Sequence, residues 1–263
     1  MLKLSVGVAT EKNRVYRRTM EDRDYHCLNF NNVDGQALLA VFDGHAGSEA
    51  SIYCEEHFHR EFVNQLLLLE EEEDDKNTNS DDKDILSVFF KTFSAIDDQL
   101  KFTHAGCTAV VSYIQKESAD KYTLYCANAG DARAVLCRNR KAVRLTRDHK
   151  GTDEWEAKRI TDNNGFVFKG RVNGVLAVTR SLGDHAMKEH VISHPYCTKT
   201  DLCPVDTYLI LACDGLWDVC EDQTAVDLVM QYKDPQKSAE KLVEYALENN
   251  STDNLSIMVL QIK

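Results

Sequence analysis

Two apolar runs in this chain each stop abruptly on an Asp-Gly pair. Residues 38–44 read LLAVFDG, and residues 208–215 read YLILACDG. A short, continuous apolar run with such a sharp end is typical of a buried core strand. Because burial removes the hydration of a carboxylate, a core strand that ends on aspartate indicates that a cation or a strong donor lies at its tip. The two runs therefore predict buried strands with an acidic site at one edge.

Helix and strand patterns occur in blocks along the chain rather than in strict alternation. Apolar residues spaced three and four apart, with Ser48 as a cap, predict two long helices after the first Asp-Gly strand. We expect helices over 48–69, 85–100, 152–162, 223–232 and 235–248. Short β-rich runs fill most of the remainder, and Asn173-Gly174 is a hairpin signal. This order favours an α+β fold in which helices cover antiparallel sheets.

Composition argues against several classes of function. The chain has 43 acidic and 31 basic residues and a formal net charge of −12, so nucleic acids and anionic membranes are poor partners. No apolar run approaches the ~18 residues of a membrane span, and the first residues do not resemble a secretion signal. The nine cysteines form no CxxC pair. We expect them to be reduced, as is usual in a cytoplasmic protein, and to fill apolar positions.

One segment has a strongly biased composition. Residues 70–84 contain nine acidic residues and two lysines, which is more than half of the net negative charge of the chain. The segment separates the two long helical patterns. We therefore expect a solvated acidic surface loop over 70–84.

Seven acidic residues lie at predicted strand ends or in the adjoining turns. They are Glu21, Asp22, Asp43, Asp131, Asp214, Asp218 and Asp253. Singly, each could be an ordinary turn or cap carboxylate. If four of them meet at about 4 Å, each of the six pairs repels by roughly 4 kcal/mol, a total on the order of 20 kcal/mol. Since a domain is stabilised by only ~5–15 kcal/mol, such a cluster would need cations, and ligands that are all oxygen favour Mg²⁺ or Mn²⁺ over Zn²⁺.

Two such cations close together would lower the pKa of a bridging water and direct it at a phosphoryl group. Arg17 and Arg18 could clamp phosphate oxygens, and His45 could protonate a leaving alkoxide. Gly44 lacks a Cβ, so its carbonyl could approach a metal closely. A competing pattern is the Cys-x5-Arg spacing of 54–60, which is found in cysteine phosphatases. It falls inside a predicted helix with two glutamates beside the thiol, so we disfavour it.

Seven segments occur in the order found in metal-dependent protein phosphatases of type 2C, the PPM family. They are RRTMED, AVFDGHAG, GCTAV, ANAGDAR, RVNGVLAVTRSLGD, LILACDGLWD and STDNLSIMV. On these motifs residues 1–263 resemble a small single-domain member of that family. The resemblance implies a four-layer α/β/β/α sandwich, two antiparallel sheets flanked by helix pairs, with the metal site in a cleft at one end. It implies hydrolysis of phosphoserine and phosphothreonine by a water between two Mg²⁺ or Mn²⁺ ions, without a phosphoenzyme intermediate.

The resemblance also gives roles to individual residues. Asp43 would bridge both metals, Glu21, Asp214, Asp253 and the Gly44 carbonyl would complete their ligands, and Asp131 and Asp218 would add a weaker third metal site. Arg17 would clamp the phosphate, His45 matches the proposed general acid, and Asp22 and Thr108 would contact the ligands rather than the metals. The expected partners are phosphorylated proteins, and the expected state is a monomer in the cytoplasm, with nuclear residence left open.

Two alternatives stay open on this sequence. A catalytically inactive scaffold with the same fold should lack metal carboxylates or the arginine, and this chain lacks none of them. A hydrolase of small phosphate esters would share the site and differ only in its substrate. Ala105, where many family members carry serine, and the segment 163–168 depart from the family pattern and leave the substrate preference open.

Overall fold

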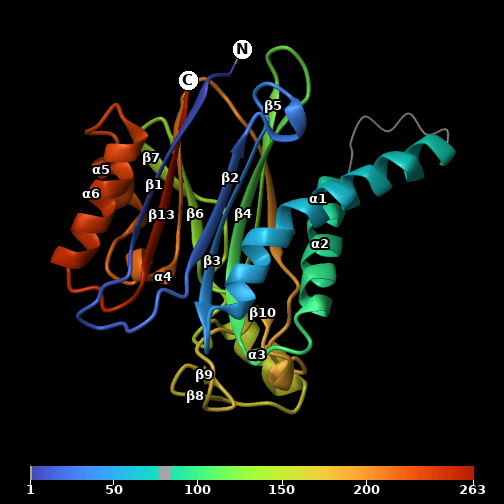
Figure 1. The fold of residues 1–263 in the computed structure, drawn as a ribbon, viewed down its shortest axis with the longest axis vertical. Coiled ribbons are helices and arrows are strands. Elements are labelled where there is room, and N and C mark those ends of the chain that lie inside the picture. The colour runs from blue at the N-terminus through green and yellow to red at the C-terminus, as the bar shows by residue number, and fades with distance from the viewer. Residues whose placement is uncertain (1, 77–83) are drawn as a thin grey trace.

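The computed structural model describes residues 2–76 and 84–263 and shows two antiparallel β-sheets packed face to face (Figure 1). The first sheet has the order β1 (Leu4–Glu11), β13 (Leu255–Ile262), β12 (Asp206–Ala212), β6 (Arg133–Arg138) and β7 (Lys141–Arg144). The second has the order β11 (Tyr196–Asp201), β5 (Tyr122–Ala129), β4 (Gly106–Lys116), β3 (Ala37–His45) and β2 (Arg23–Leu28), with β10 (Leu182–Gly183) paired to β4.

Helices cover the outer face of each sheet, so the expected four-layer α+β sandwich is confirmed (Figure 1). Helices α1 (Glu49–Lys76) and α2 (Ile85–Gln99) pack on the second sheet. Helices α4 (Asp214–Trp217), α5 (Asp222–Val229) and α6 (Pro235–Glu248) pack on the first. Between β7 and β11 lie α3 (Glu154–Asp162), β8 (Val167–Phe168), β9 (Arg171–Val172) and the 3₁₀ turn η2 (His185–Met187). A second 3₁₀ turn, η1 (Phe30–Asn32), precedes β3.

The apolar run of β3 is continuous because both faces of this strand are buried. Leu38, Ala40 and Phe42 belong to the core under α1 and α2. Leu39 and Val41 belong to the core between the two sheets. Successive side chains of a strand point to opposite faces, so every position from 37 to 42 needs an apolar residue and the first position free to be polar is 43.

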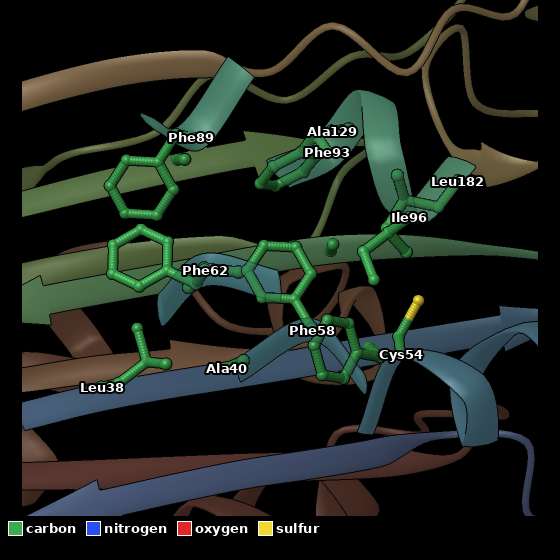
Figure 2. Packing of buried hydrophobic residues seen from close by; sticks show 14 of the residues in the cluster. Leu38, Ala40, Cys54, Phe58, Phe62, Phe89, Phe93, Ile96, Ala129 and Leu182 are labelled. Carbon is green, nitrogen blue, oxygen red and sulfur yellow. The ribbon is translucent and has the colours of Figure 1, made fainter. Parts of the chain in front are cut away.

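Aromatic side chains join the two long helices to the sheet beneath them. Figure 2 shows Phe58 and Phe62 of α1 facing Phe93 and Phe89 of α2 above the strands. The ring centroids of Phe62 and Phe89 are 4.9 Å apart, and those of Phe58 and Phe93 are 5.2 Å apart. These distances are typical of favourable tilted and edge-on aromatic pairs, which hold the two helices against each other over the sheet.

The prediction of a loop over 70–84 is wrong for its first half. Helix α1 continues through the acidic run to Lys76, and its far end extends beyond the sheet in Figure 1. The cause is that glutamate is a good helix former and a helix, once nucleated, extends at little cost per residue. Asp84 accepts a hydrogen bond from the Ser87 N–H as the cap of α2, and 77–83 lie outside the described residues.

Other features follow the sequence closely. Asn173 and Gly174 have positive φ angles of 50° and 74° and form a tight turn, but only an isolated bridge between Val172 and Leu176 accompanies it, not a long hairpin. All nine cysteines are free thiols. No helix within the two described ranges is long and apolar enough to cross a bilayer.

Candidate metal centre and phosphate-binding cleft

A cleft of about 520 Å³ opens at one end of the sandwich, beside the ends of β3, β5 and β12. In Figure 1 this is the end where β3 points toward β8 and β9, away from both termini. The cleft is lined by nine of the predicted site residues: Arg17, Asp43, Gly44, His45, Thr108, Asp131, Asp214, Asp218 and Asp253. Segments separated by more than two hundred positions along the chain thus contribute to one site.

Three carboxylates form the centre of this cleft. Oxygen atoms of Asp43, Asp131 and Asp214 all lie within 4.8 Å of one another. They come from the end of β3, from the turn between β5 and β6, and from the first residue of α4. The antiparallel pairing of β3 with β4 places Asp43 opposite Thr108, and both residues line the cleft.

The electrostatics of this cluster favour a bound cation or a proton. Burial raises the pKa of Asp43 well above its usual range, and the neighbouring Asp22, Asp214 and Asp131 raise it further. Burial likewise raises the pKa of Asp214, followed by repulsion from Asp131 and Asp218. Such a set of oxygen ligands without histidine or cysteine fits the preference of Mg²⁺ and Mn²⁺.

Lys150 places a cation at this cluster, and this residue was not predicted from the sequence. Its Nζ lies 2.7 Å from an Asp218 oxygen and 3.4 Å from an Asp131 oxygen. Burial lowers the pKa of Lys150, but attraction to Asp131 and Asp218 outweighs it, and the net shift is upward. Lys150 therefore stays charged and neutralises the two acids that were predicted to hold a third metal. No local pattern marks this lysine, because its partners are distant in the sequence.

Asp22 and Thr108 lie beneath the cluster, and both are buried. Burial raises the pKa of Asp22 to about 6, although the side chains of Cys213 and Ser256 lower it. Asp22 Oδ2 and Thr108 Oγ1 have no hydrogen-bond partner among the described residues. Unpaired buried polar atoms are uncommon, and of these two residues Thr108 lines the cleft whereas Asp22 does not.

Glu21 is the one predicted metal ligand whose side chain the structure does not bring into the cleft lining. Its carboxylate accepts hydrogen bonds from the Thr19 hydroxyl at 2.7 Å and from the Gly47 N–H at 3.4 Å. Its backbone carbonyl packs against Gly44, where an added Cβ would come within 2.5 Å of that oxygen. Gly44 is thus required for close backbone packing, a reason additional to the one expected from the sequence.

Of the two candidate arginines, Arg17 lines the cleft and Arg18 does not. The Arg17 guanidinium contacts the Asp253 carboxylate and donates from Nε to the Thr252 carbonyl at 3.2 Å. Burial raises the pKa of Asp253, while the Asn254 N–H and Arg17 lower it. Arg17 therefore lies at the edge of the acidic cluster with its side chain half exposed.

His45 is held by an aspartate that the sequence analysis left without a role. His45 Nε2 lies 2.7 Å from Oδ2 of Asp184, which also accepts a 2.5 Å hydrogen bond from the Ser181 hydroxyl. Burial raises the pKa of Asp184, but these hydrogen bonds lower it by more, so that the net pKa lies below its usual value. A Cβ on Gly106 would come 2.1 Å from the Asp184 carboxylate, so the glycine makes room for the pair. Asp184 ends the RSLGD segment. That segment belongs to one of the family motifs, and it was the sequence signal that could have identified this aspartate.

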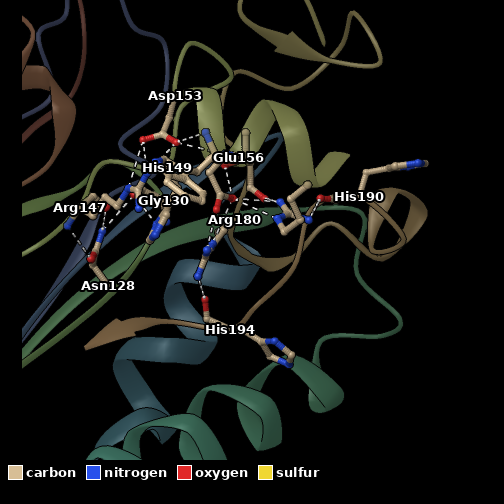
Figure 3. Close-up of polar contacts among 12 residues, drawn as sticks. Asn128, Gly130, Arg147, His149, Asp153, Glu156, Arg180, His190 and His194 are labelled. Carbon is tan, nitrogen blue, oxygen red and sulfur yellow. Dashed lines mark hydrogen bonds and ion pairs between the residues drawn. The ribbon is translucent and has the colours of Figure 1, made fainter. Parts of the chain in front are cut away.

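Residues 150–195, which we call the flap, form one wall of the cleft and contribute Thr152, Arg171 and Leu176 to its lining. Figure 3 shows contacts that hold the flap together internally, with Glu156 beside Arg180, and Arg180 reaching the backbone of His194. Glu156 is buried and accepts hydrogen bonds from Arg180 at 2.6 Å, Thr179 at 2.8 Å and Arg159 at 3.0 Å.

A second group of contacts in Figure 3 ties the segment just before the flap to the end of β5. The His149 N–H donates to the Gly130 carbonyl at 2.9 Å, and Asn128 Nδ2 donates to the Arg147 carbonyl at 2.6 Å. Because Asp131 follows Gly130 directly, these bonds fix one metal-site candidate and one wall of the cleft with the same contacts.

Comparison with known proteins identifies the family of this chain. A family model described as Protein phosphatase 2C matches residues 6–255. The chain belongs to the protein phosphatase 2C family. It is 42% identical over 262 residues to Protein phosphatase 2C homolog 1 of Schizosaccharomyces pombe, covering 97% of this chain and 72% of that protein. It is 41% identical to Protein phosphatase 2C homolog 1 of Saccharomyces cerevisiae, covering 97% and 92%. As a protein phosphatase 2C it is a protein serine/threonine phosphatase.

Solved structures agree with this assignment. A Caenorhabditis elegans sex determining protein superposes with a TM-score of 0.84 at 27% identity, covering 98% of this chain and 64% of that one. A serine-threonine phosphatase 2C from Toxoplasma gondii superposes with a TM-score of 0.80 at 22% identity, covering 99% and 95%, and supports the fold alone. Protein phosphatases 2C depend on metal ions, and the Asp43–Asp131–Asp214 cluster is a group that could bind one.

Proposed function

We propose that this protein phosphatase 2C hydrolyses phosphoserine and phosphothreonine in proteins with two Mg²⁺ or Mn²⁺ ions and without a phosphoenzyme intermediate. The observation that carries the proposal is the convergence of Asp43, Asp131 and Asp214 oxygens within 4.8 Å in the cleft. Glu21, Asp43, Asp214, Asp253 and the Gly44 carbonyl would hold the two ions, and Asp131 and Asp218 a weaker third. When bound, the ions would supply a water of lowered pKa and neutralise phosphoryl charge.

The protein side chains would then position the phosphate and exclude alternatives. Arg17 would receive the phosphate oxygens, because its planar guanidinium binds them in a fork and it lines the cleft beside Asp253. The described cleft lining contains no cysteine and no serine, which supports direct hydrolysis over transfer of the phosphoryl group to either of these nucleophiles. The Cys54 thiol is fully buried in the middle of α1, so the cysteine-phosphatase alternative has no support.

The proposal is tested by phosphate release from a phosphothreonine peptide with Mn²⁺ or Mg²⁺, and then with a chelator. We expect activity with either ion and its loss on chelation. Activity that persists in chelator would refute the metal mechanism. Absence of activity on every phosphopeptide would favour the scaffold alternative, and better hydrolysis of sugar phosphates than of peptides would favour small esters as substrates.

We further propose that His45 protonates the leaving serine or threonine oxygen and that Asp184 orients its ring. A general acid matters most for a poor leaving group, and such a residue contributes about 10²–10⁴-fold. We therefore expect His45→Ala to lower kcat for a phosphothreonine peptide by about 10²-fold or more. Hydrolysis of p-nitrophenyl phosphate, whose leaving group needs no proton, should fall far less.

The matched variant is Asp184→Asn, which keeps the shape but removes the charge 2.7 Å from His45 Nε2. It should show the same substrate dependence with a smaller loss, and adding it to His45→Ala should cause little further loss because the two act as a unit. Equal losses on both substrates would contradict the role in proton transfer.

We also propose that residues 1–263 act as one catalytic domain, as a monomer, in the cytoplasm, with nuclear residence left open. The family match over residues 6–255 and the nine free thiols support this, since reduced cysteines are usual in those compartments. Light scattering on the purified chain should give a mass close to 29.8 kDa.

A further inference from the structure

The loop between β1 and β2 gathers positive charge beside the catalytic cleft of a protein whose net charge is −12. A separate shallow hollow there, of about 580 Å³, is lined by Lys12, Arg14, Val15, Tyr16, Arg17 and Arg18. We call this set the basic hollow. Its lining has four cations and no carboxylate, which is the opposite of the surrounding surface and of the acidic cluster in the cleft.

Most of these cations have no partner within the protein. Arg17 contacts Asp253, but the side chains of Lys12, Arg14 and Arg18 make no ion pair or hydrogen bond with residues 2–76 or 84–263. Two apolar side chains between them are also exposed, Val15 by 84% and Tyr16 by 57%. Uncompensated cations flanking exposed apolar groups are typical of a surface that binds an anionic partner.

The backbone of the loop is fixed, so the positions from which the cationic side chains extend are set before any ligand arrives. Asn13 is buried with a φ of 57°, and its carbonyl accepts the N–H groups of Tyr16 and Arg17 at 2.9 and 3.0 Å. Its side chain donates to the Ser251 carbonyl at 2.7 Å. A loop ordered in this way loses little conformational entropy on binding.

The same contacts connect the basic hollow to the metal-site candidates. Asn254 Nδ2 donates to the carbonyls of Lys12 at 2.8 Å and of Thr19 at 3.0 Å, closing both ends of the loop. Asn254 follows Asp253, and Arg17 lines both the hollow and the cleft. A peptide whose phosphate bound at Arg17 would therefore lie next to a hollow that Lys12 and Arg14 also line.

We propose that the basic hollow is a second anion subsite, which binds a phosphorylated or carboxylate side chain of the same substrate peptide. This inference rests on the proposed phosphopeptide hydrolysis and names the substrate class: peptides with a second negative group near the phosphothreonine that is cleaved. Lys12 and Arg14 would form charge-assisted hydrogen bonds to that group. A second phosphate, with more charge and more acceptor oxygens, would bind more tightly than a glutamate.

The test measures binding separately from turnover. The Asp43→Asn protein, which we expect not to cleave, is titrated with fluorescent phosphothreonine peptides. Each carries alanine, glutamate or phosphoserine at one position two to four residues away, since a residue spans at most ~3.6 Å. We expect affinity to rise from alanine to glutamate to phosphoserine, by about tenfold overall at low salt, and the difference to shrink as salt screens it. Adding Lys12→Ala and Arg14→Ala should abolish the difference.

Two controls make the result specific. Arg60→Ala with Lys121→Ala removes the same charge from exposed positions elsewhere and should leave the preference intact. Arg14→Lys, which keeps the charge, should retain most of the preference for the peptide with the second negative group. In the otherwise unchanged enzyme, Lys12→Ala with Arg14→Ala should lower kcat/KM for the doubly phosphorylated peptide about tenfold while p-nitrophenyl phosphate hydrolysis stays within about twofold.

Three outcomes would overturn the inference. They are equal affinity for the three peptides, a preference that survives Lys12→Ala with Arg14→Ala, and loss of the preference in the Arg60 and Lys121 control. Binding to phosphatidylserine vesicles that depends on Arg14, without discrimination among peptides, would assign the hollow to a membrane surface instead. Because binding is measured without turnover, an inactive enzyme that still prefers the doubly phosphorylated peptide would refute only the proposed hydrolysis.

Discussion

Replacing Asp43 by asparagine is expected to abolish metal-dependent hydrolysis and, in the presence of a chelator, to make the protein more stable. Burial and then Asp22, Asp214 and Asp131 raise the pKa of Asp43 well above its usual range, so its charge is costly when no cation balances it. Loss of a central ligand should lower kcat/KM by about 10³-fold or more. Removal of the charge should raise the free energy of unfolding in chelator. Urea unfolding with chelator and with Mn²⁺ measures the effect on stability, and phosphopeptide assays measure the effect on kcat/KM.

The same carboxylates set how the stability of the chelated protein depends on pH. A group whose pKa is raised by folding stabilises the folded state below its unfolded pKa and loses that contribution as pH rises through the folded value. For Asp22, raised by burial from 3.8 to about 6, the loss falls between about pH 4 and pH 6. We expect added Mn²⁺ to remove most of this loss. Asp120→Asn, at an exposed turn, is the control for a general charge effect.

Two results would argue against this account of Asp43. One is a variant that is less stable than the natural protein in chelator. The other is a variant that Mn²⁺ stabilises as much as it stabilises the natural protein, because binding stabilises only where the site remains.

The second large effect is expected at Glu156, far from the metal cluster but central to the flap. Its carboxylate is buried and accepts hydrogen bonds from Arg159, Thr179 and Arg180. Glu156→Gln would leave two arginines facing a neutral group in a poorly hydrated position. Breaking a buried ion pair from one side costs about 3–5 kcal/mol. We expect that loss in urea unfolding, and a fall in phosphopeptide hydrolysis because Lys150, Arg171 and Leu176 line the cleft from the same segment.

The pH dependence of Glu156 has the opposite sign to that of Asp22. Burial raises the pKa of Glu156, but Arg180, Arg159 and Thr179 lower it by more than burial raises it. The net result is a pKa of about 2. Its stabilising contribution is therefore present above its unfolded pKa of 4.5 and is lost as pH falls toward 2. Glu156→Gln should flatten this acid limb. Glu154→Gln, exposed on the same helix, should change stability by less than about 0.5 kcal/mol, and an equal effect of the two variants would show that the buried network is not stabilising.

Much of the fold could be predicted from local pattern. Helix α6 occupies 235–248 as predicted, because Pro235 follows the capping Asp234 and apolar residues recur at helical spacing. The β3 run was predicted to be a buried strand, and the structure adds that its two sides face two different cores. The extension of α1 through 70–76 was missed because charge density was read as disorder while the helix propensity of glutamate favoured continuation.

The residues of the candidate site also fall into two groups, those that a local pattern predicted and those that only the structure identified. Acids that end strands are visible in sequence, because a polar residue directly after a buried run is a local anomaly, as at Asp43 and Asp214. Asp184, Lys150 and Glu156 carry no such anomaly. Their importance lies in partners more than twenty positions away, namely His45, Asp218 and Arg180. A sequence shows which residues are available for pairing, but not which distant ones meet.

The sequence alone determined that strands end on carboxylates, that a cluster of them would require cations, and that helices cover the sheets, because burial, charge repulsion and periodicity act on neighbours along the chain. The tertiary structure decided which acids share a cleft, which arginine reaches it, and that unpaired cations of the β1–β2 loop lie at its edge. Those choices depend on strand register and on loops closed by distant side chains such as Asn254, and contacts of that kind form only when the whole chain has folded.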